Sequence, residues 1–152
     1  MLSTASLLPK LIARYPELLF APGSRFAWSP DEKTVFYDQQ DPENTSLLLH
    51  ELAHGVLGHH TYSKDIELVA MESEAWEKAL SIAEDYAVEI TNDTIQDNLD
   101  TYRTWLHDRS ICPQCEATGF QSGKSTYGCV ACSHTWRVND ARICALRRYS
   151  TT

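Results

Sequence analysis

The sequence of 152 residues predicts an α+β fold, in which a mainly helical domain with a small β-hairpin or sheet precedes a small cysteine-rich module. Two short runs, 25–29 and 34–38, alternate apolar and polar residues with the period of β-strands. All five cysteines lie beyond residue 111, and four of them form two C-x-x-C pairs. Elsewhere apolar residues recur every three or four positions, as in amphipathic helices, over residues 4–15, 45–58, 64–90 and 94–107.

The first predicted helix begins at a capping residue, Ser3 or Thr4, and ends near Tyr15. Pro9 is compatible with this helix only in its first turn, because a proline further inside removes a backbone hydrogen bond. The prolines and the glycine of segment 16–23 then predict a loop.

The two strand-like runs predict a hairpin, because the segment between them, 30–33, begins with Pro-Asp, a pair that favours a β-turn. Phe26 and Trp28 share one face of the first run, and Val35 and Tyr37 share one face of the second. An edge strand of such a hairpin can bind an extended peptide as an added strand. The alternative is that the hairpin serves only core packing.

An H-E-x-x-H motif lies in the next predicted helix, which is capped within 41–45 and ends near Gly58. Residues four apart share a helix face, so His50 and His54 can bind one metal ion while Glu51 stands beside it. These three residues are the fewest that a zinc hydrolase with this motif requires. The alternative is a core helix that contains two hydrogen-bonded histidines.

A catalytic zinc site has three protein ligands and one open position, so a third ligand must accompany the two histidines. His60 lies where the metzincin pattern H-E-x-x-H-x-x-G-x-x-H has its third histidine. That pattern requires a glycine where this chain has Leu57, and Gly58 is displaced by one. The other candidates are His59, Glu67, Glu72, Glu74 and Glu77.

Glu72 is favoured by the helix predicted over 64–90. It shares a face with Ala75 and Ala79, whose small side chains would let this helix approach the histidine helix closely. Glu74 points about 200° away from Glu72 and is expected to face solvent.

These residues resemble the ImmA/IrrE-type metallopeptidases, a gluzincin-like family in which H-E-x-x-H is followed by a helix bearing E-x-x-A-(N/D)-x-x-A. The resemblance covers about residues 1–90 and implies a zincin-like fold with zinc held by His50, His54 and Glu72. It implies that Glu51 is the general base of peptide-bond hydrolysis, and that an edge strand lines the substrate cleft. The matching positions are His50, Glu51, His54, Glu72, Ala75 and Ala79.

Trp76 departs from the family pattern, because a polar residue that steadies a histidine ligand usually occupies this position. The Leu-Leu-x-Pro segment common in the family is also absent after Ala83. The resemblance predicts a zinc-dependent peptidase that cleaves an intracellular regulatory protein. Candidate donors to the oxyanion are His59, His60 and Tyr62.

Two other functions compete with this prediction. In a nucleic-acid-associated or regulatory protein the H-E-x-x-H metal would be structural, which requires His60 or His59 as a fourth ligand. A DNA-bound protease of the Spartan kind also joins H-E-x-x-H to a zinc module. Its third ligand is a later histidine, and His107 and His134 are badly placed for that role.

The cysteine module has the spacing of a zinc ribbon, with Cys112 and Cys115 in one pair and Cys129 and Cys132 in the other. Four cysteine ligands close a site, so we expect a structural zinc here in addition to the catalytic zinc. Cys144 is unassigned. Phe120, Tyr127 and Trp136 would form either the small core of the module or an exposed aromatic patch.

The charge distribution suggests two domains, 1–108 and 109–152. Residues 1–102 contain 6 Lys/Arg and 18 Asp/Glu, a net charge of -12, whereas residues 103–152 contain 7 and 3, a net charge of +4. The ribbon could therefore bind nucleic acid, and the alternatives are protein contact or scaffolding. Its arginines include Arg137, Arg142, Arg147 and Arg148.

We expect a cytoplasmic protein with no membrane partner. No apolar stretch reaches the roughly 18 residues that span a bilayer. Residues 1–14 lack the features of a secretory signal. A reducing compartment also suits cysteines that bind metal.

Overall fold

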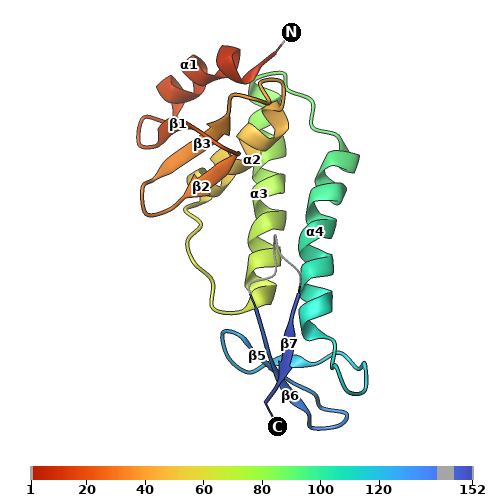
Figure 1. Cartoon of the computed structure of the whole chain (residues 1–152). Coiled ribbons are helices and arrows are strands. Elements are labelled where there is room, and N and C mark those ends of the chain that lie inside the picture. The colour runs from red at the N-terminus through yellow and green to blue at the C-terminus, as the bar shows by residue number, and fades with distance from the viewer. Residues whose placement is uncertain (1, 140–145, 152) are drawn as a thin grey trace. The chain divides into compact units, whose positions relative to one another are not determined.

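The computed structural model describes residues 2–139 and 146–151, and over these residues the chain forms four helices and two small sheets (Figure 1). The predicted α+β class is confirmed. Arg142 and Cys144 lie outside the described residues. The chain divides into two compact units, one with residues up to Thr61 and Met71–Ile95, the other with Tyr62–Ala70 and residues from Gln96 onward.

The first helix, α1 (Thr4–Arg14), begins with a capping box in which Ser3 Oγ accepts from the backbone N–H of Ser6. Pro9 lies inside the helix beyond its first turn, so the expectation that the helix tolerates this proline only in the first turn is wrong. The helix survives the lost hydrogen bond because Leu7 and Leu11 are fully buried and tie it to the rest of the unit.

The first sheet contains β1 (Leu19–Gly23), β2 (Ala27–Ser29) and β3 (Thr34–Asp38), in the order β1-β3-β2. β2 and β3 are antiparallel, which confirms the hairpin. β1 pairs with β3 in parallel, so the loop predicted over 16–23 is wrong. Pro22 is tolerated because β1 is an edge strand, where a missing N–H breaks no ladder.

The second helix, α2 (Thr45–Leu57), packs on β2 and β3. Asn44 caps its start by accepting from the backbone N–H of Leu47, and Gly58 ends it in the left-handed conformation, with φ 69°. Gly55 lies at the closest approach to the sheet: a Cβ there would lie 2.9 Å from the Trp28 ring. Only glycine therefore lets α2 lie this near to β2.

Two longer helices follow, α3 (Asp65–Asp85) and α4 (Asn92–Ser110). α3 ends earlier than the predicted residue 90, because Ala87 takes a left-handed φ of 55° and Val88 N–H returns to the carbonyl of Ala83. Glycine usually takes this left-handed position in the C-terminal cap of a helix. Here Ala87 takes it, so the sequence contains no glycine that would mark the end of the helix. No helix of the described chain is long and apolar enough to span a membrane.

The second sheet is an antiparallel meander in the order β4-β5-β6-β7, with strands β4 (Phe120–Gln121), β5 (Thr126–Gly128), β6 (Thr135–Val138) and β7 (Arg148–Ser150). Tyr127 and Trp136 are stacked in its small core, with ring centroids 5.9 Å apart, whereas Phe120 is 50% exposed. The aromatic residues are thus divided between core and surface.

A buried ion pair connects the start of α3, the end of α4 and the ribbon, all within the second unit. Asp65 accepts from Arg109 Nε at 2.8 Å and from the Tyr127 hydroxyl at 2.6 Å. Asp65 and Arg109 are each 2% exposed. The predicted boundary at residue 108 stays a prediction, but these contacts show that Tyr62–Ala70 groups with the ribbon.

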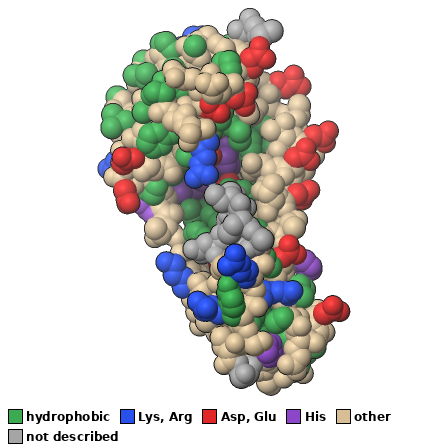
Figure 2. Space-filling view, viewed as in Figure 1, with side chains coloured by type: hydrophobic (Ala, Val, Ile, Leu, Met, Phe, Trp, Pro, Cys, Tyr) green, Lys and Arg blue, Asp and Glu red, His purple; other side chains and the backbone are tan. Residues whose placement is uncertain are grey.

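On the face shown in Figure 2, Lys and Arg side chains gather over the ribbon strands. Residues 117–139 and 146–151 contain no Asp or Glu. Their basic residues are Lys124, Arg137, Arg147 and Arg148, all exposed, and the Arg137 guanidinium lies 4.9 Å from the centre of the Tyr149 ring. The ribbon surface therefore combines positive charge with an exposed aromatic ring.

Replacing Asp65 by Ala should lower the free energy of unfolding by about 3–5 kcal/mol, because Arg109 would remain buried without its counter-charge. Chemical denaturation of the full chain measures this change. Asp108→Ala, at an exposed acidic residue beside Arg109, is the matched control and should change stability little. A loss for Asp65→Ala no larger than that of the control would contradict the importance of the ion pair.

Candidate metal centres

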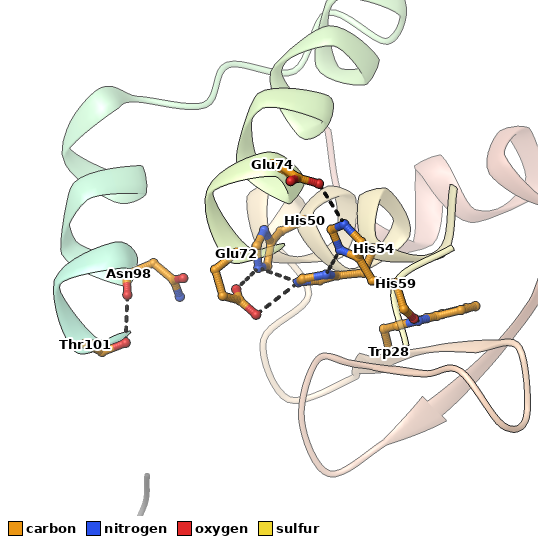
Figure 3. A network of polar contacts seen from close by, with 8 residues as sticks. All are labelled: Trp28, His50, His54, His59, Glu72, Glu74, Asn98 and Thr101. Carbon is orange, nitrogen blue, oxygen red and sulfur yellow. Dashed lines mark hydrogen bonds and ion pairs between the residues drawn. The ribbon is translucent and has the colours of Figure 1, made fainter. Parts of the chain in front are cut away.

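The first candidate centre contains two histidines from α2 and one glutamate from α3 (Figure 3). His50 Nε2 lies 2.8 Å from one carboxylate oxygen of Glu72, and His54 Nε2 lies 3.2 Å from the other. The two Nε2 atoms are themselves 3.2 Å apart. All three residues are buried, at 1%, 6% and 5% exposure for His50, His54 and Glu72 respectively.

The position of each candidate ligand follows from its place along its helix. His50 and His54 are one turn apart on α2, and Glu72 lies on the face of α3 that also carries the fully buried Ala75 and Ala79. Small residues there permit the close approach of the two helices. Of the other predicted third-ligand candidates, His60, Glu67, Glu74 and Glu77 are exposed and lie outside the described group of possible ligands.

The electrostatics of the group depend on Glu72. Burial by itself would raise the pKa of this carboxyl, but hydrogen bonds from His50 and His54 lower it to about 2. Burial likewise favours the neutral form of His54, but Glu72 and Glu51 raise its pKa above the ordinary 6.5. The carboxylate therefore remains ionised and favours the protonated form of His54.

The geometry fits a zinc ion. Tetrahedral zinc with bonds of about 2.0–2.1 Å to nitrogen holds two ligand nitrogens about 3.3 Å apart, close to the 3.2 Å found here. The two Nε2 atoms lie close together beside the Glu72 carboxylate, and they cannot both carry a proton directed at the other. A single cation, in contrast, can contact all three candidate ligand atoms. Two histidines and a glutamate are also a known catalytic zinc set.

Glu51 follows His50 directly and is half-buried. Burial raises its pKa, and the nearby charges of His50 and His54 oppose that rise. A carboxyl with a raised pKa accepts a proton more readily near neutral pH, which is the property that a general base needs.

His59 contacts a candidate ligand and is not itself one of the group. Its Nδ1 lies 2.8 Å from His54 Nδ1, and its Nε2 lies 3.2 Å from Glu74 Oε2. The sequence suggested His59 as a ligand or an oxyanion donor and Glu74 as a ligand or a solvent-facing residue, and sequence reasoning missed this pairing. The available signal was Gly58, because a left-handed helix end turns the following residue back onto the helix.

Trp76 also contacts a candidate ligand, in a way that the sequence did not indicate. Its ring is stacked on His50, with centroids 4.2 Å apart and an interplanar angle of 20°. His50 Nδ1 is buried and has no hydrogen-bond partner among the residues that the structure describes. Apart from their contacts with Glu72, the His50 ring is therefore held by stacking on Trp76, and the His54 ring by its contact with His59.

The second candidate centre contains the four cysteines of the ribbon. Cys112 Sγ lies 3.6 Å from Cys132 Sγ, and Cys115 Sγ lies 3.5 Å from Cys129 Sγ. A disulfide would need about 2.05 Å, whereas zinc with bonds of about 2.3 Å holds sulfurs about 3.8 Å apart. The four cysteines thus fit a tetrahedral, closed site.

Both C-x-x-C pairs are followed by the same turn. Glu116 and Ser133 each have a left-handed φ, of 66° and 64°, and each donates its backbone N–H to the carbonyl of the first cysteine of its pair. Burial raises the pKa of the Cys112 thiol, but the backbone N–H groups of Cys115 and Gln114 lower it to about 7. Amide donors directed at sulfur stabilise the thiolate that binds metal.

No protein-family model, curated protein or solved structure matches this chain. The assignment of the two groups as candidate metal centres rests on their geometry and on the chemistry of their donor atoms.

The metal-free protein should lose stability as the pH rises above 6.5. The raised pKa of His54 means that its protonated form stabilises the fold below 6.5, and that this contribution disappears as the pH passes the folded-state value. Glu72 acts in the opposite direction, and its contribution disappears as the pH falls from 4.5 toward 2. Denaturant unfolding of the metal-free wild type and of His54→Asn measures the effect as their difference.

His60→Asn is the control for that experiment, because His60 is exposed and outside the group. It should keep the pH dependence of the wild type. If His54→Asn keeps it as well, the protonated His54–Glu72 pair does not stabilise the metal-free fold.

Proposed function

We propose that this protein is a zinc-dependent peptidase, with zinc at His50, His54 and Glu72 and with Glu51 as the general base. The observation that supports this most is the number of ligands: over the described residues the group contains three and no fourth. Three protein ligands leave one position for the reaction, whereas a structural site is closed by four. The zincin-like fold and the resemblance to ImmA/IrrE-type peptidases belong to this proposal.

The rival function, a structural metal at H-E-x-x-H, needs His60 or His59 as a fourth ligand. His60 is exposed, and His59 Nδ1 lies against the outer nitrogen of His54, on the side away from Glu72. These positions support an open site. A hydroxamate would bind such a site after cobalt substitution and change its absorption spectrum, whereas a closed site would not respond.

Zinc supplies a Lewis acid that acidifies water and polarises a carbonyl. In the proposed reaction Glu51 takes a proton from the attacking water while the new C–O bond forms. It then gives a proton to the leaving amine as the C–N bond breaks. Its raised pKa helps it to hold the proton between these two steps.

The substrate that we propose is an extended segment of an intracellular regulatory protein. β2 is an edge strand and packs on α2, the helix that carries the centre. The other edge, β1, contains Pro22, which has no N–H to pair with a peptide. β2 is therefore the better edge for an added substrate strand. A cytoplasmic location also belongs to the proposal, since the cysteine site needs a reducing compartment.

Glu51→Gln should retain zinc and lose proteolysis by about 10²–10⁴-fold, because the amide cannot accept the proton. Comparative proteomics of host cells expressing wild type or Glu51→Gln measures the activity and names the substrate. Glu77→Gln, at an exposed glutamate outside the group, should cleave like the wild type. Cleavage by Glu51→Gln as fast as by the wild type would show that Glu51 is not the general base.

Nucleic-acid binding by the ribbon is a second candidate function, favoured by the exposed Arg137–Tyr149 pair and by the lack of Asp and Glu in the described segments 117–139 and 146–151. Basic side chains contact phosphates, and aromatic rings stack on unpaired bases. Contact with a protein remains the competing proposal for this surface.

If the ribbon binds nucleic acid, the full chain should bind a single-stranded DNA oligonucleotide more weakly as salt rises. Tyr149→Ala should weaken binding by about fivefold or more, the loss of one base stack. Arg103→Ala, an exposed arginine of α4 outside the ribbon, is the control. Binding that is absent, or unaffected by Tyr149→Ala, would favour the protein-contact proposal.

A further inference from the structure

A series of polar contacts runs from an exposed carboxylate to the outer nitrogen of His54 (Figure 3). His54 Nδ1 lies 2.8 Å from His59 Nδ1, and His59 Nε2 lies 3.2 Å from Glu74 Oε2. The His59 side chain is only 11% exposed, whereas that of Glu74 is 61% exposed. Neither residue takes part in the proposed hydrolysis steps.

The backbone of His59 is held on both sides. Its N–H donates to the carbonyl of His54 at 3.0 Å, as the left-handed Gly58 turns the chain back. Its carbonyl accepts from Trp28 Nε1 on β2 at 2.9 Å. The helix end and the sheet therefore hold the His59 backbone beside His54, independently of the contact between the two rings.

The contacts determine which nitrogen of each ring carries a proton. A hydrogen bond between two Nδ1 atoms needs one N–H and one lone pair. A carboxylate only accepts, so Glu74 requires a proton on His59 Nε2, which leaves the lone pair of a neutral His59 on Nδ1. His54 must then donate from its Nδ1, so in a neutral His54 the lone pair lies on Nε2, where a metal ion can bind it.

The reverse arrangement fails at Glu74, because His59 would direct a lone pair at the carboxylate. It would also put an N–H of His54, rather than a lone pair, where the three candidate ligand atoms meet, and so block a cation there. The contact between Glu74 and His59 therefore favours the form of His54 that can bind a cation.

We infer that His59 and Glu74 are positioning residues of the metal centre, which hold His54 in its metal-binding tautomer and orientation. The inference rests on the metal assignment of the proposed function, but does not depend on which reaction follows. Within the described part of the chain His50 has no equivalent pair, because its Nδ1 is unpartnered there and its ring is stacked on Trp76. Metal binding through His54 should thus respond to His59, while the stacked His50 should not.

Zinc affinity of the full chain, measured by competition with a chelator, tests this inference. His59→Phe keeps a ring but removes the acceptor, and should weaken zinc binding at this centre by about 10–100-fold. His59→Asn places an amide oxygen near the former Nδ1 and should restore most of the affinity. His60→Phe, at the exposed neighbouring histidine, is the matched control and should bind zinc like the wild type.

Cobalt substitution separates the two centres, because only the cysteine site gives sulfur-to-metal charge-transfer bands. The bands of the histidine centre should shift in His59→Phe and return in His59→Asn, while the sulfur bands stay constant in both. Unchanged zinc affinity in His59→Phe, or an equal loss of zinc affinity in His59→Phe and His59→Asn, would overturn the inference.

Glu74→Ala tests the outer contact without disturbing the core, since this side chain is mostly exposed. It should weaken zinc binding by about two- to fivefold, the range of an exposed ion pair, relative to Glu77→Ala on the same helix. Equal affinities for these two variants would remove Glu74 from the positioning pair. None of these measurements uses proteolysis, so an inactive wild type with normal zinc binding would count against the peptidase proposal alone.

Discussion

Two histidine nitrogens lie 3.2 Å apart beside one buried carboxylate, and this contact between α2 and α3 organises the first unit. Burying Glu72 costs free energy unless positive charge lies close to it. The histidines supply hydrogen bonds that keep it ionised, and the close helix approach that they require explains the small residues Ala75 and Ala79. The cost of burying Glu72 is thus offset by hydrogen bonds from two histidines, in a group whose three ligand atoms could hold a cation.

The two histidines are held by different means. Trp76 stacks on His50, where a polar partner would be expected, while His54 is held by His59 and Glu74. Stacking fixes the plane of a ring but does not choose its tautomer, whereas a hydrogen bond does both. Under the proposed metal assignment, this division makes His54 the ligand through which residues outside the centre would influence metal binding.

The second unit depends on two further groups that are polar and buried. The four sulfurs of the two C-x-x-C turns lie within reach of one metal ion, and the Asp65–Arg109 pair joins the ribbon to one end of α3 and to one end of α4. Buried charges that are paired and hydrogen-bonded impose a specific arrangement, because alternatives would leave one of them alone. Asp65 and Glu72 lie on the same helix, so α3 contributes a buried carboxylate to each unit.

Local chemistry in the sequence determined the four helices, the hairpin, the two cysteine pairs and the choice of Glu72 over Glu74, because each depends on spacing within one segment. The sequence did not reveal β1, whose parallel pairing joins residues that no turn connects, or the end of α3, where Ala87 adopts a conformation typical of glycine. Only the tertiary structure decided that His59 lies against His54, that Trp76 stacks on His50 and that Asp65 meets Arg109. These contacts join side chains from separate turns and helices. The periodicity of residues along one segment contains no information about which of its side chains contact those of another segment.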